Sequence, residues 1–347
     1  MDYFIPLLSS FIIAFTTIRL CKPIAIRTGL VDSPNARKIH VGEVPLVGGF
    51  GIFISILTAS MLFIDNSRHL NLYLIASALI LFLGTLDDRY DLSVRVRLVS
   101  QVIVSSLIIF GTEIHLTSLG NLFGMFEIQL GFIGALVTVV GIIAGINAFN
   151  MIDGIDGLAG STSIITFCSL AYLFADSANE LFLLPILFIA ALAAYLMFNL
   201  GLHRSLSKVF MGDSGNMLIG LTIVWLMVIG VQSEQQYLRP VTALYLIAIP
   251  LMDMAAIMIR RVKRGVSPFK ADREHLHHIF ERAGYSRKQT LCIISLMSVF
   301  FAVIGCWSEV EQVPEWIMFF TFLIVFAMYN WALQNIWTIL TWLRKKS

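Results

Sequence analysis

The sequence predicts an all-α protein that crosses a membrane about eleven times. Of its 347 residues, 58% are hydrophobic and 13% are charged, whereas a soluble domain carries about 25% charged residues. The apolar residues come in runs close to the roughly 20 residues that a helix needs to span a bilayer. The 24 Lys and Arg nearly balance the 22 Asp and Glu, so the chain lacks the concentrated basic charge that binds nucleic acid. These observations exclude a soluble globule and make the lipid bilayer, not nucleic acid, the expected partner.

Eleven apolar runs follow one another, and each predicts one helix. They cover about residues 3–20, 46–64, 70–86, 98–114, 130–147, 158–175, 181–199, 214–231, 240–259, 290–308 and 316–342. No cationic segment precedes the first run, so we expect a retained span rather than a cleaved signal peptide. The longest segment between runs is too short for a core of its own. We therefore expect residues 1–347 to form a single polytopic membrane domain.

The cations separate sharply between the two sets of connecting segments. The odd-numbered connections, together with Arg19 and the C-terminal tail, hold 22 of the 24 Lys and Arg, and the even-numbered ones hold only Arg68 and Arg239. Because cytoplasmic loops carry the excess of Lys and Arg, the N-terminus is predicted to be periplasmic and the C-terminus cytoplasmic. The predicted cytoplasmic loops cover about residues 21–45, 87–97, 148–157, 200–213 and 260–289.

Two adjacent carboxylates, Asp87 and Asp88, end the third run. Negative charge at the C-terminal end of a helix opposes the helix dipole, so a purely structural role would be an odd choice. Paired hard oxygen ligands suit Mg²⁺ or Mn²⁺, which commonly bridges carboxylates to substrate phosphates. The alternative is a solvated helix end whose carboxylates pair with Arg89 or Arg95.

The segment after the fifth run is the most informative in the chain. Asn147 and Asn150 are three residues apart and share a helix face, and Asp153 and Asp156 are each followed by Gly, which lets the backbone turn tightly near a ligand. A loop with two carboxylates and no neighbouring cation favours a site for a cation or a polar substrate. The alternative is a plain turn.

Small residues open the eighth run, at Gly212, Asp213 and Ser214. Free backbone N–H groups at a helix N-terminus favour an anion, and Asp213 could hold a metal over the same phosphate. Asp and Ser are also ordinary N-cap residues, which is the alternative.

Three imidazoles, His275, His277 and His278, lie in the most basic loop, next to Arg273. Imidazoles and cations together can neutralise a diphosphate or assist a phosphate leaving group. A zinc site is the less favoured interpretation because no Cys lies near and no H-E-x-x-H pattern is present. The alternative for the basic residues is attraction of anionic lipid.

Two further segments carry candidate residues. Asp253 lies inside the ninth run, where a carboxylate is a functional candidate by default, and its expected partner is Arg260 or Arg261. The alternative is a structural ion pair at the helix end. Lys38 and His40, in the first cytoplasmic loop, could help clamp a phosphate, and the alternative for this segment is helix packing through Gly48 and Gly49.

Four motifs in this order, at Asp87-Asp88 and at residues 147–156, 210–215 and 275–278, together resemble the polyprenyl-phosphate N-acetylhexosamine-1-phosphate transferases. The resemblance covers nearly the whole chain. The segments 147–151 and 249–254 are most similar to members that use UDP-N-acetylglucosamine and undecaprenyl phosphate. The resemblance implies transfer of N-acetylglucosamine-1-phosphate to undecaprenyl phosphate with release of UMP, the first lipid-linked step of a cell-surface polysaccharide. It further implies Mg²⁺, with Mn²⁺ as a substitute, a bacterial inner membrane and an active site on the cytoplasmic face. A homodimer is an open expectation. Asn216 departs from the family pattern, which often has Ser there.

The resemblance also implies roles for the candidate residues. Asn150, Asp213 and Asp88 are expected to bind the metal, and Asp87 and Asp88 to orient or deprotonate the lipid phosphate. Asp153 and Asp156 are expected to shape the nucleotide site, although these two aspartate pairs could exchange roles. The three histidines are expected to contact the diphosphate. The substrate-binding candidates are Asn147, Lys38, His40, Gly212, Ser214, Arg273 and Asp253.

Three alternatives stay open at this point. The same chemistry could use another UDP-N-acetylhexosamine donor. A secondary transporter would also have many spans, but its site should lie near the bilayer midplane, and only Asp253 suggests this. A CDP-alcohol phosphatidyltransferase also uses clustered aspartates with Mg²⁺, but its pattern has an Arg after the first Asp-Gly, which residues 153–160 lack.

Overall fold

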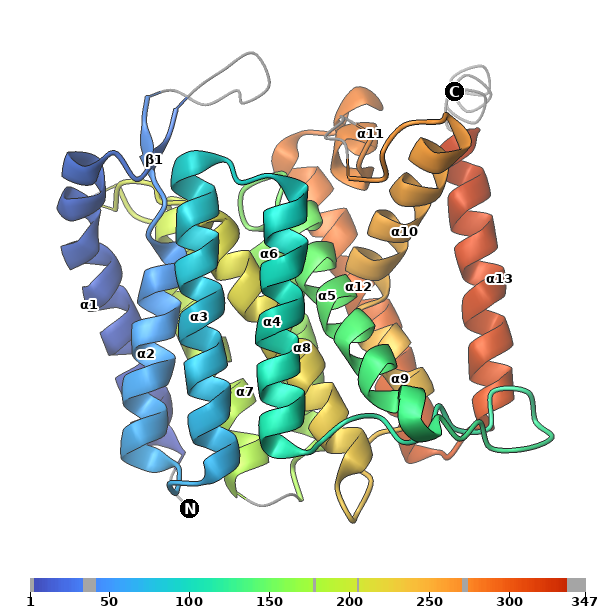
Figure 1. The fold of residues 1–347 in the computed structure, drawn as a ribbon. Helices are drawn as coiled ribbons and strands as arrows, with labels where there is room; N and C mark the ends of the chain where they lie inside the picture. The colour runs from blue at the N-terminus through green and yellow to red at the C-terminus, as the bar shows by residue number, and fades with distance from the viewer. Residues whose placement is uncertain (1–2, 34–41, 177–178, 205, 270–273, 336–347) are drawn as a thin grey trace.

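The computed structural model describes a bundle of helices, and it covers residues 3–33, 42–176, 179–204, 206–269 and 274–335. The long helices run between two ends of the bundle, so that α1 starts at the lower end and α13 finishes at the upper end (Figure 1). In chain order the elements are α1 (Phe4–Thr28), β1 (Val31–Asp32), β2 (Val44–Pro45), α2 (Gly48–Phe63), α3 (Arg68–Tyr90), α4 (Val94–Thr112), η1 (Gly131–Ile133), α5 (Gly134–Ile152), α6 (Leu158–Leu173), α7 (Asn179–Asn199), α8 (Gly212–Gln232), α9 (Pro240–Leu246), α10 (Ala248–Lys263), α11 (Leu276–Arg282), α12 (Arg287–Val310) and α13 (Glu315–Gln334).

The chain is a multi-pass membrane protein by the length and apolar character of its helices. Within the described residues, eight helices are long and apolar enough to cross a membrane. Helices α2 and α6 have 16 residues each and are shorter than such a span. The run predicted as one helix over 240–259 is instead two helices, α9 and α10, bent by 85°. Eight spans among the described residues are fewer than the eleven that the sequence predicts, and the sequence also missed the bend.

The bend between α9 and α10 is stabilised by a side chain from another helix. Ile247, at the junction, has a non-helical backbone, and Pro250 follows it in the first turn of α10. The Thr166 hydroxyl of α6 donates a hydrogen bond of 3.0 Å to the Leu246 carbonyl. Such a carbonyl is left without a helical partner at a break, and a neighbouring Ser or Thr can satisfy it in an apolar medium.

Helix α8 is the centre of the bundle. Nearly all of its length is buried, and it packs against α2, α3 and α5. Glycine permits the closest of these contacts, because a side chain on Gly220 would meet the Ile146 backbone of α5. Small residues let membrane helices approach closely in this way.

A short β-hairpin links the first connection to the start of α8. Strands β1 and β2 pair antiparallel, and Leu46 then pairs in parallel with Phe210. The Gly48 and Gly49 N–H groups donate to the Phe210 and Met211 carbonyls at 3.0 and 3.1 Å. The segment before α8 is thereby held to the β2–α2 junction, which places Gly212 and the residues after it.

Candidate active site

The N-terminus of α8 is capped by a carboxylate from a different helix. Asp88, in the last turn of α3, accepts hydrogen bonds from the backbone N–H groups of Asp213 at 2.7 Å and Ser214 at 3.2 Å. These are free donors in the first turn of any α-helix, and negative charge there is favoured by the helix dipole. Gly212 has a φ of +77°, and a side chain on it would collide with the Asp88 carboxylate. Glycine at 212 therefore brings the two helices into contact.

Three carboxyl groups gather at this junction. Asp87 is buried; its Oδ2 lies 3.1 Å from the Arg97 guanidinium and its Oδ1 accepts from the Leu92 N–H at 2.9 Å. Asp213 is influenced by the charges of Asp87, Asp88 and Arg97 together. Arg97 is thus one cation near three carboxyl groups, an imbalance that favours a bound cation.

Asp153 and Asp156 leave the end of α5 in different directions. One oxygen of Asp153 accepts a hydrogen bond of 2.7 Å from the Asn216 amide, one turn into α8. Asp156 forms an ion pair of 2.6 Å with Lys208. The Asn216 contact brings the α5–α6 loop to α8, the helix that Asp88 caps, so two of the sequence motifs meet there.

Two asparagines on α5 were expected to share a face, and they have different surroundings. Asn147 donates hydrogen bonds of 2.8 Å to the Gln101 side chain of α4 and to the Ile143 carbonyl. Asn150 is half-buried one turn later. Asn147 therefore joins α5 to α4 through a hydrogen bond, whereas Asn150 lies closer to the loop that carries Asp153.

The histidine loop folds back onto the α5–α6 loop. His277 is buried, and its ring fills the space that a side chain on Gly154 would occupy. The His275 and His277 rings stack with centroids 5.7 Å apart, and His278 lies 4.1 Å from His277. Gly154 was expected to allow a tight turn, and the structure gives it a second role because it admits an imidazole.

Asp253 holds this histidine loop in place. Its Oδ2 lies 2.9 Å from His275 Nδ1, and its Oδ1 accepts from the Leu276 N–H at 3.0 Å and from the Tyr329 hydroxyl at 3.1 Å. The expectation that Arg260 or Arg261 pairs with Asp253 is wrong, because Arg260 pairs with Glu274 and Arg261 donates to the Pro268 carbonyl. Asp253 is 1% exposed, so it supports His275 from behind.

The pKa values of the loop residues differ from their usual range. Asp153 is open to solvent on one side, and desolvation by the protein packed around it raises its pKa to about 6; the Asp156 charge adds to this, and the Asn216 hydrogen bond opposes it. Burial lowers the pKa of His277 to about 2, and the charges of His278, His275 and Arg287 act in the same direction. His277 is therefore neutral near pH 7, and it offers a hydrogen bond rather than a charge.

The donor set suits a metal that is only partly enclosed by protein. Within the described part of the chain, no three His, Cys, Asp or Glu side chains lie together so as to hold a metal. Mg²⁺ usually takes one or two protein carboxylates and keeps waters and phosphate oxygens as its other ligands. Asp213 and Asp88, in a group of three carboxyls facing one Arg, fit this requirement.

Three of the predicted residues, Lys38, His40 and Arg273, lie outside the described residues. Sequence reasoning missed the contacts of Arg97, Gln101, Lys208 and Tyr329. The sequence marks Asn216 only as a departure from the family pattern, and in the structure its side-chain amide donates a hydrogen bond to Asp153. None of these carried a sequence signal of its own, because their partners lie 10 to 76 residues away.

Comparisons with known proteins agree on one family. The sequence model of glycosyl transferase family 4 matches residues 70–231. A Salmonella typhi protein named undecaprenyl-phosphate alpha-N-acetylglucosaminyl 1-phosphate transferase is 41% identical over 98% of this chain and 93% of its own length. Proteins of the same name from Haemophilus influenzae and Escherichia coli K12 are 42% and 39% identical, over 97% and 96% of this chain and 95% and 92% of their own lengths.

Proposed function

Because the chain belongs to glycosyl transferase family 4, we propose that it transfers N-acetylglucosamine-1-phosphate from UDP-N-acetylglucosamine to undecaprenyl phosphate. An oxygen of the lipid phosphate bonds to the sugar-linked phosphorus, the bond from that phosphorus to the bridging oxygen breaks, and UMP leaves. The observation that carries the proposal is that four segments meet at one end of a membrane bundle. Asp88 caps the N-terminus of α8, and Asn216 of α8 donates a hydrogen bond to Asp153. The loop that carries Asp153 in turn packs against His277. A lipid phosphate and a water-soluble nucleotide can meet only at such an end.

The candidate residues would have two kinds of role, which are binding the metal ion and positioning the lipid phosphate. Asp213, with Asp88 and Asn150, would hold a Mg²⁺ ion, and Mn²⁺ could replace it. The bound ion would supply positive charge to the diphosphate and orient it. Asp87, fixed by Arg97, would keep the lipid phosphate aligned, and Asp153 would accept its remaining proton. The second pKa of a phosphate monoester is about 6, so little proton transfer is needed near pH 7, and positioning carries most of the catalysis.

The remaining candidates would contact the substrates. Asp156, beside Lys208, suits the nucleotide side, and His275, His277 and His278 suit the diphosphate. Lys38, His40, Arg273, Gly212 and Ser214 would contribute further phosphate contacts. The site would face the cytoplasm of a bacterial inner membrane, with the N-terminus periplasmic and the whole chain acting as one domain, alone or as a homodimer. The product would begin a lipid-linked cell-surface polysaccharide.

The direct test incubates the purified full-length protein with undecaprenyl phosphate, UDP-N-acetylglucosamine and Mg²⁺, and measures UMP. We expect UMP release that stops when EDTA is added and returns with excess Mg²⁺. UDP-N-acetylgalactosamine in a parallel reaction tests the donor. Absence of UMP with every UDP-N-acetylhexosamine, from protein that is monodisperse in detergent, would contradict the proposal.

The pH dependence of UMP release should report on Asp153. Its pKa is raised to about 6, so the carboxylate needed to accept a proton is lost as the pH falls through that value, and the rate should fall with it. The lipid phosphate titrates in the same range, and Asn216→Ala separates the two groups. Loss of the Asn216 hydrogen bond raises the pKa of Asp153 and should move the acidic limb up by about 1 pH unit. An unmoved limb in the variant would assign it to the lipid.

Replacement of Gly154 by alanine should disturb the histidine loop. The added methyl group would overlap the His277 ring, so the ring must move away from the α5–α6 loop. We expect kcat/KM for the UDP-sugar to fall about 10- to 100-fold, the range found when a positioning contact shifts by about 1 Å. Gly141→Ala, at a position with open space, is the matched control and should leave the kinetics unchanged. Unchanged kinetics in Gly154→Ala would show that His277 can move without cost.

A further inference from the structure

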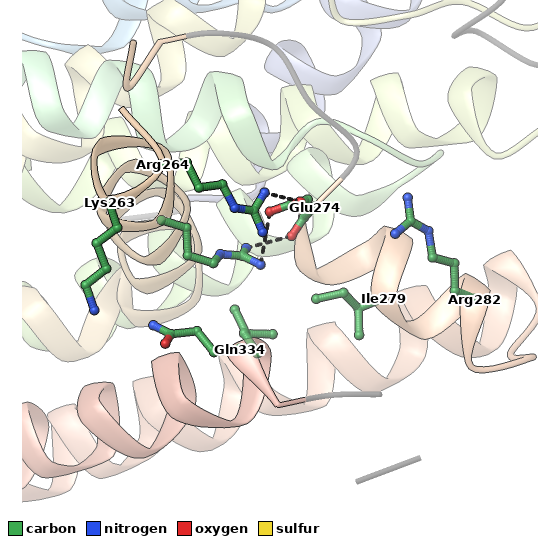
Figure 2. Close-up of a pocket in the computed structure, with 8 residues that line it drawn as sticks. Lys263, Arg264, Glu274, Ile279, Arg282 and Gln334 are labelled. Carbon is green, nitrogen blue, oxygen red and sulfur yellow. Dashed lines mark hydrogen bonds and ion pairs between the residues drawn. The ribbon is translucent and has the colours of Figure 1, made fainter. Parts of the chain in front are cut away.

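A cationic pocket lies beside the candidate active site, between α10, α11 and the end of α13. It has a volume of about 310 Å³, and its lining includes Arg260, Lys263, Arg264, Glu274, Arg282 and Leu333. Figure 2 shows Lys263 and Arg282 on opposite sides of the view, with Glu274 and Ile279 between them. None of the lining residues belongs to the candidate active site, so the proposed reaction does not explain the pocket.

The charge of the pocket is strongly positive. Four of its lining residues are cations and one, Glu274, is an anion. Glu274 pairs with Arg264 at 2.5 Å and with Arg260 at 3.4 Å, and no carboxylate of the described residues pairs with Lys263 or Arg282. Arg260 is 8% exposed, and its Nε has no hydrogen-bond acceptor in the described part of the chain. A buried donor without an acceptor is costly, and a bound anion could relieve it.

The pocket lies where the surrounding helices leave the membrane. The apolar helices α10 and α13 end at Lys263 and Gln334, beside the pocket. Trp331 and Val262, from the same two helix ends, are 62% and 61% exposed. Exposed Trp at the end of a span is typical of the membrane–water interface. The mixed lining, with Leu333 and Ile279 next to the cations, suits a molecule that is part apolar and part anionic.

We propose that this pocket binds the phosphate headgroup of an anionic phospholipid of the surrounding bilayer. Basic pockets between membrane helices on the cytoplasmic side bind such headgroups. The phosphate would lie between Lys263 and Arg282, and the acyl chains would follow the exposed apolar surface of α13. A lipid in this position would join α10 and α13, which carry Asp253 and Tyr329, to α11, whose N-cap residue is His275.

Native mass spectrometry of the full-length protein in detergent tests the proposal. The protein is mixed with equal amounts of dioleoyl phosphatidylglycerol and dioleoyl phosphatidylcholine, and the ratio of the two bound species is measured. We expect a preference for phosphatidylglycerol that falls about tenfold or more in Lys263→Ala/Arg282→Ala, since each cation near an anionic headgroup contributes about fivefold. Lys263→Gln alone should lose about fivefold. The matched control, Arg95→Ala/Lys288→Ala, removes one exposed Arg and one exposed Lys elsewhere on the chain and should keep the wild-type ratio.

Two competition arms distinguish the sources of the phosphate. Excess inorganic phosphate should leave phosphatidylglycerol bound, and its displacement would overturn the assignment to a lipid. Undecaprenyl phosphate should not displace phosphatidylglycerol one for one, and such displacement would make the pocket a carrier-lipid site instead. A wild-type ratio in both pocket variants, or an equal loss in the control, would overturn the proposal. Equal elution of all variants in gel filtration ensures that the comparison is between folded proteins.

Discussion

Replacement of Asp213 by asparagine is expected to lower kcat for UMP release about 100- to 1000-fold, the loss that follows removal of one preorganised electrostatic group from an active site. Asp213 lies in the first turn of α8 and is influenced by the charges of Asp87, Asp88 and Arg97. Asparagine keeps the shape of the side chain and removes its charge. The site would then bind Mg²⁺ more weakly, so raising the Mg²⁺ concentration should restore part of the rate.

The fold of the Asp213→Asn variant should be unchanged. It is the backbone N–H of residue 213, not its side chain, that donates to Asp88, so the cap of α8 is kept. Asp65→Asn, at an exposed position between α2 and α3, is the matched control and should retain the wild-type rate. A rate near that of wild type in Asp213→Asn, with no added dependence on Mg²⁺, would remove Asp213 from the site.

Two replacements of Asp88 should separate its structural role from its charge. Asp88→Ala removes both acceptors for the N–H groups of residues 213 and 214, and loss of an N-cap acceptor costs about 1 kcal/mol. We expect a lower midpoint of thermal unfolding in detergent and loss of UMP release by about 1000-fold or more, because α8 also carries Asp213 and Asn216 to the site.

Asp88→Asn keeps one carbonyl oxygen as a cap and loses the charge. Its unfolding midpoint should lie between those of Asp88→Ala and wild type, because one of the two N–H groups keeps its acceptor, whereas its kcat should stay about 100-fold or more below wild type. If activity returned together with stability, Asp88 would be a cap alone and would have no part in the chemistry. Fluorescence-monitored unfolding and the UMP assay on the same preparations give both readouts.

The positions of the helices could be predicted from the sequence because a bilayer demands long apolar runs. The bend of 85° at Ile247 could not: Pro250 in the run 240–259 indicates that the helix is interrupted, but a proline alone does not fix the size of the bend. It depends on Thr166, in another helix, as a donor to the freed Leu246 carbonyl. Likewise α2 and α6 end after 16 residues, although their apolar runs suggest longer helices.

The candidate site shows the same division between local and long-range contacts. Asp87, Asp88, Asp153 and Asp213 could be selected from the sequence because carboxylates at the ends of apolar helices need an explanation. The partner of Asp253 could not be. Arg260 and Arg261 are about two helical turns away, but the chain reverses after α10 and brings His275 to Asp253 instead. Helical spacing predicts which residues are neighbours on one helix. It does not predict that the segment after α10 folds back so that His275 contacts Asp253.

The hydrogen bond between Tyr329 and Asp253 has a consequence for the synthesis of the protein. Tyr329 follows Asp253 by 76 residues, so a ribosome has translated the aspartate and the histidine loop well before it reaches the tyrosine. The nascent chain can pair Asp253 with His275 while α13 has still to be made, but the third partner joins only when the last helix enters the membrane. The set of hydrogen bonds that fixes Asp253 behind the histidine loop is therefore complete only after the last helix of the described chain has been made.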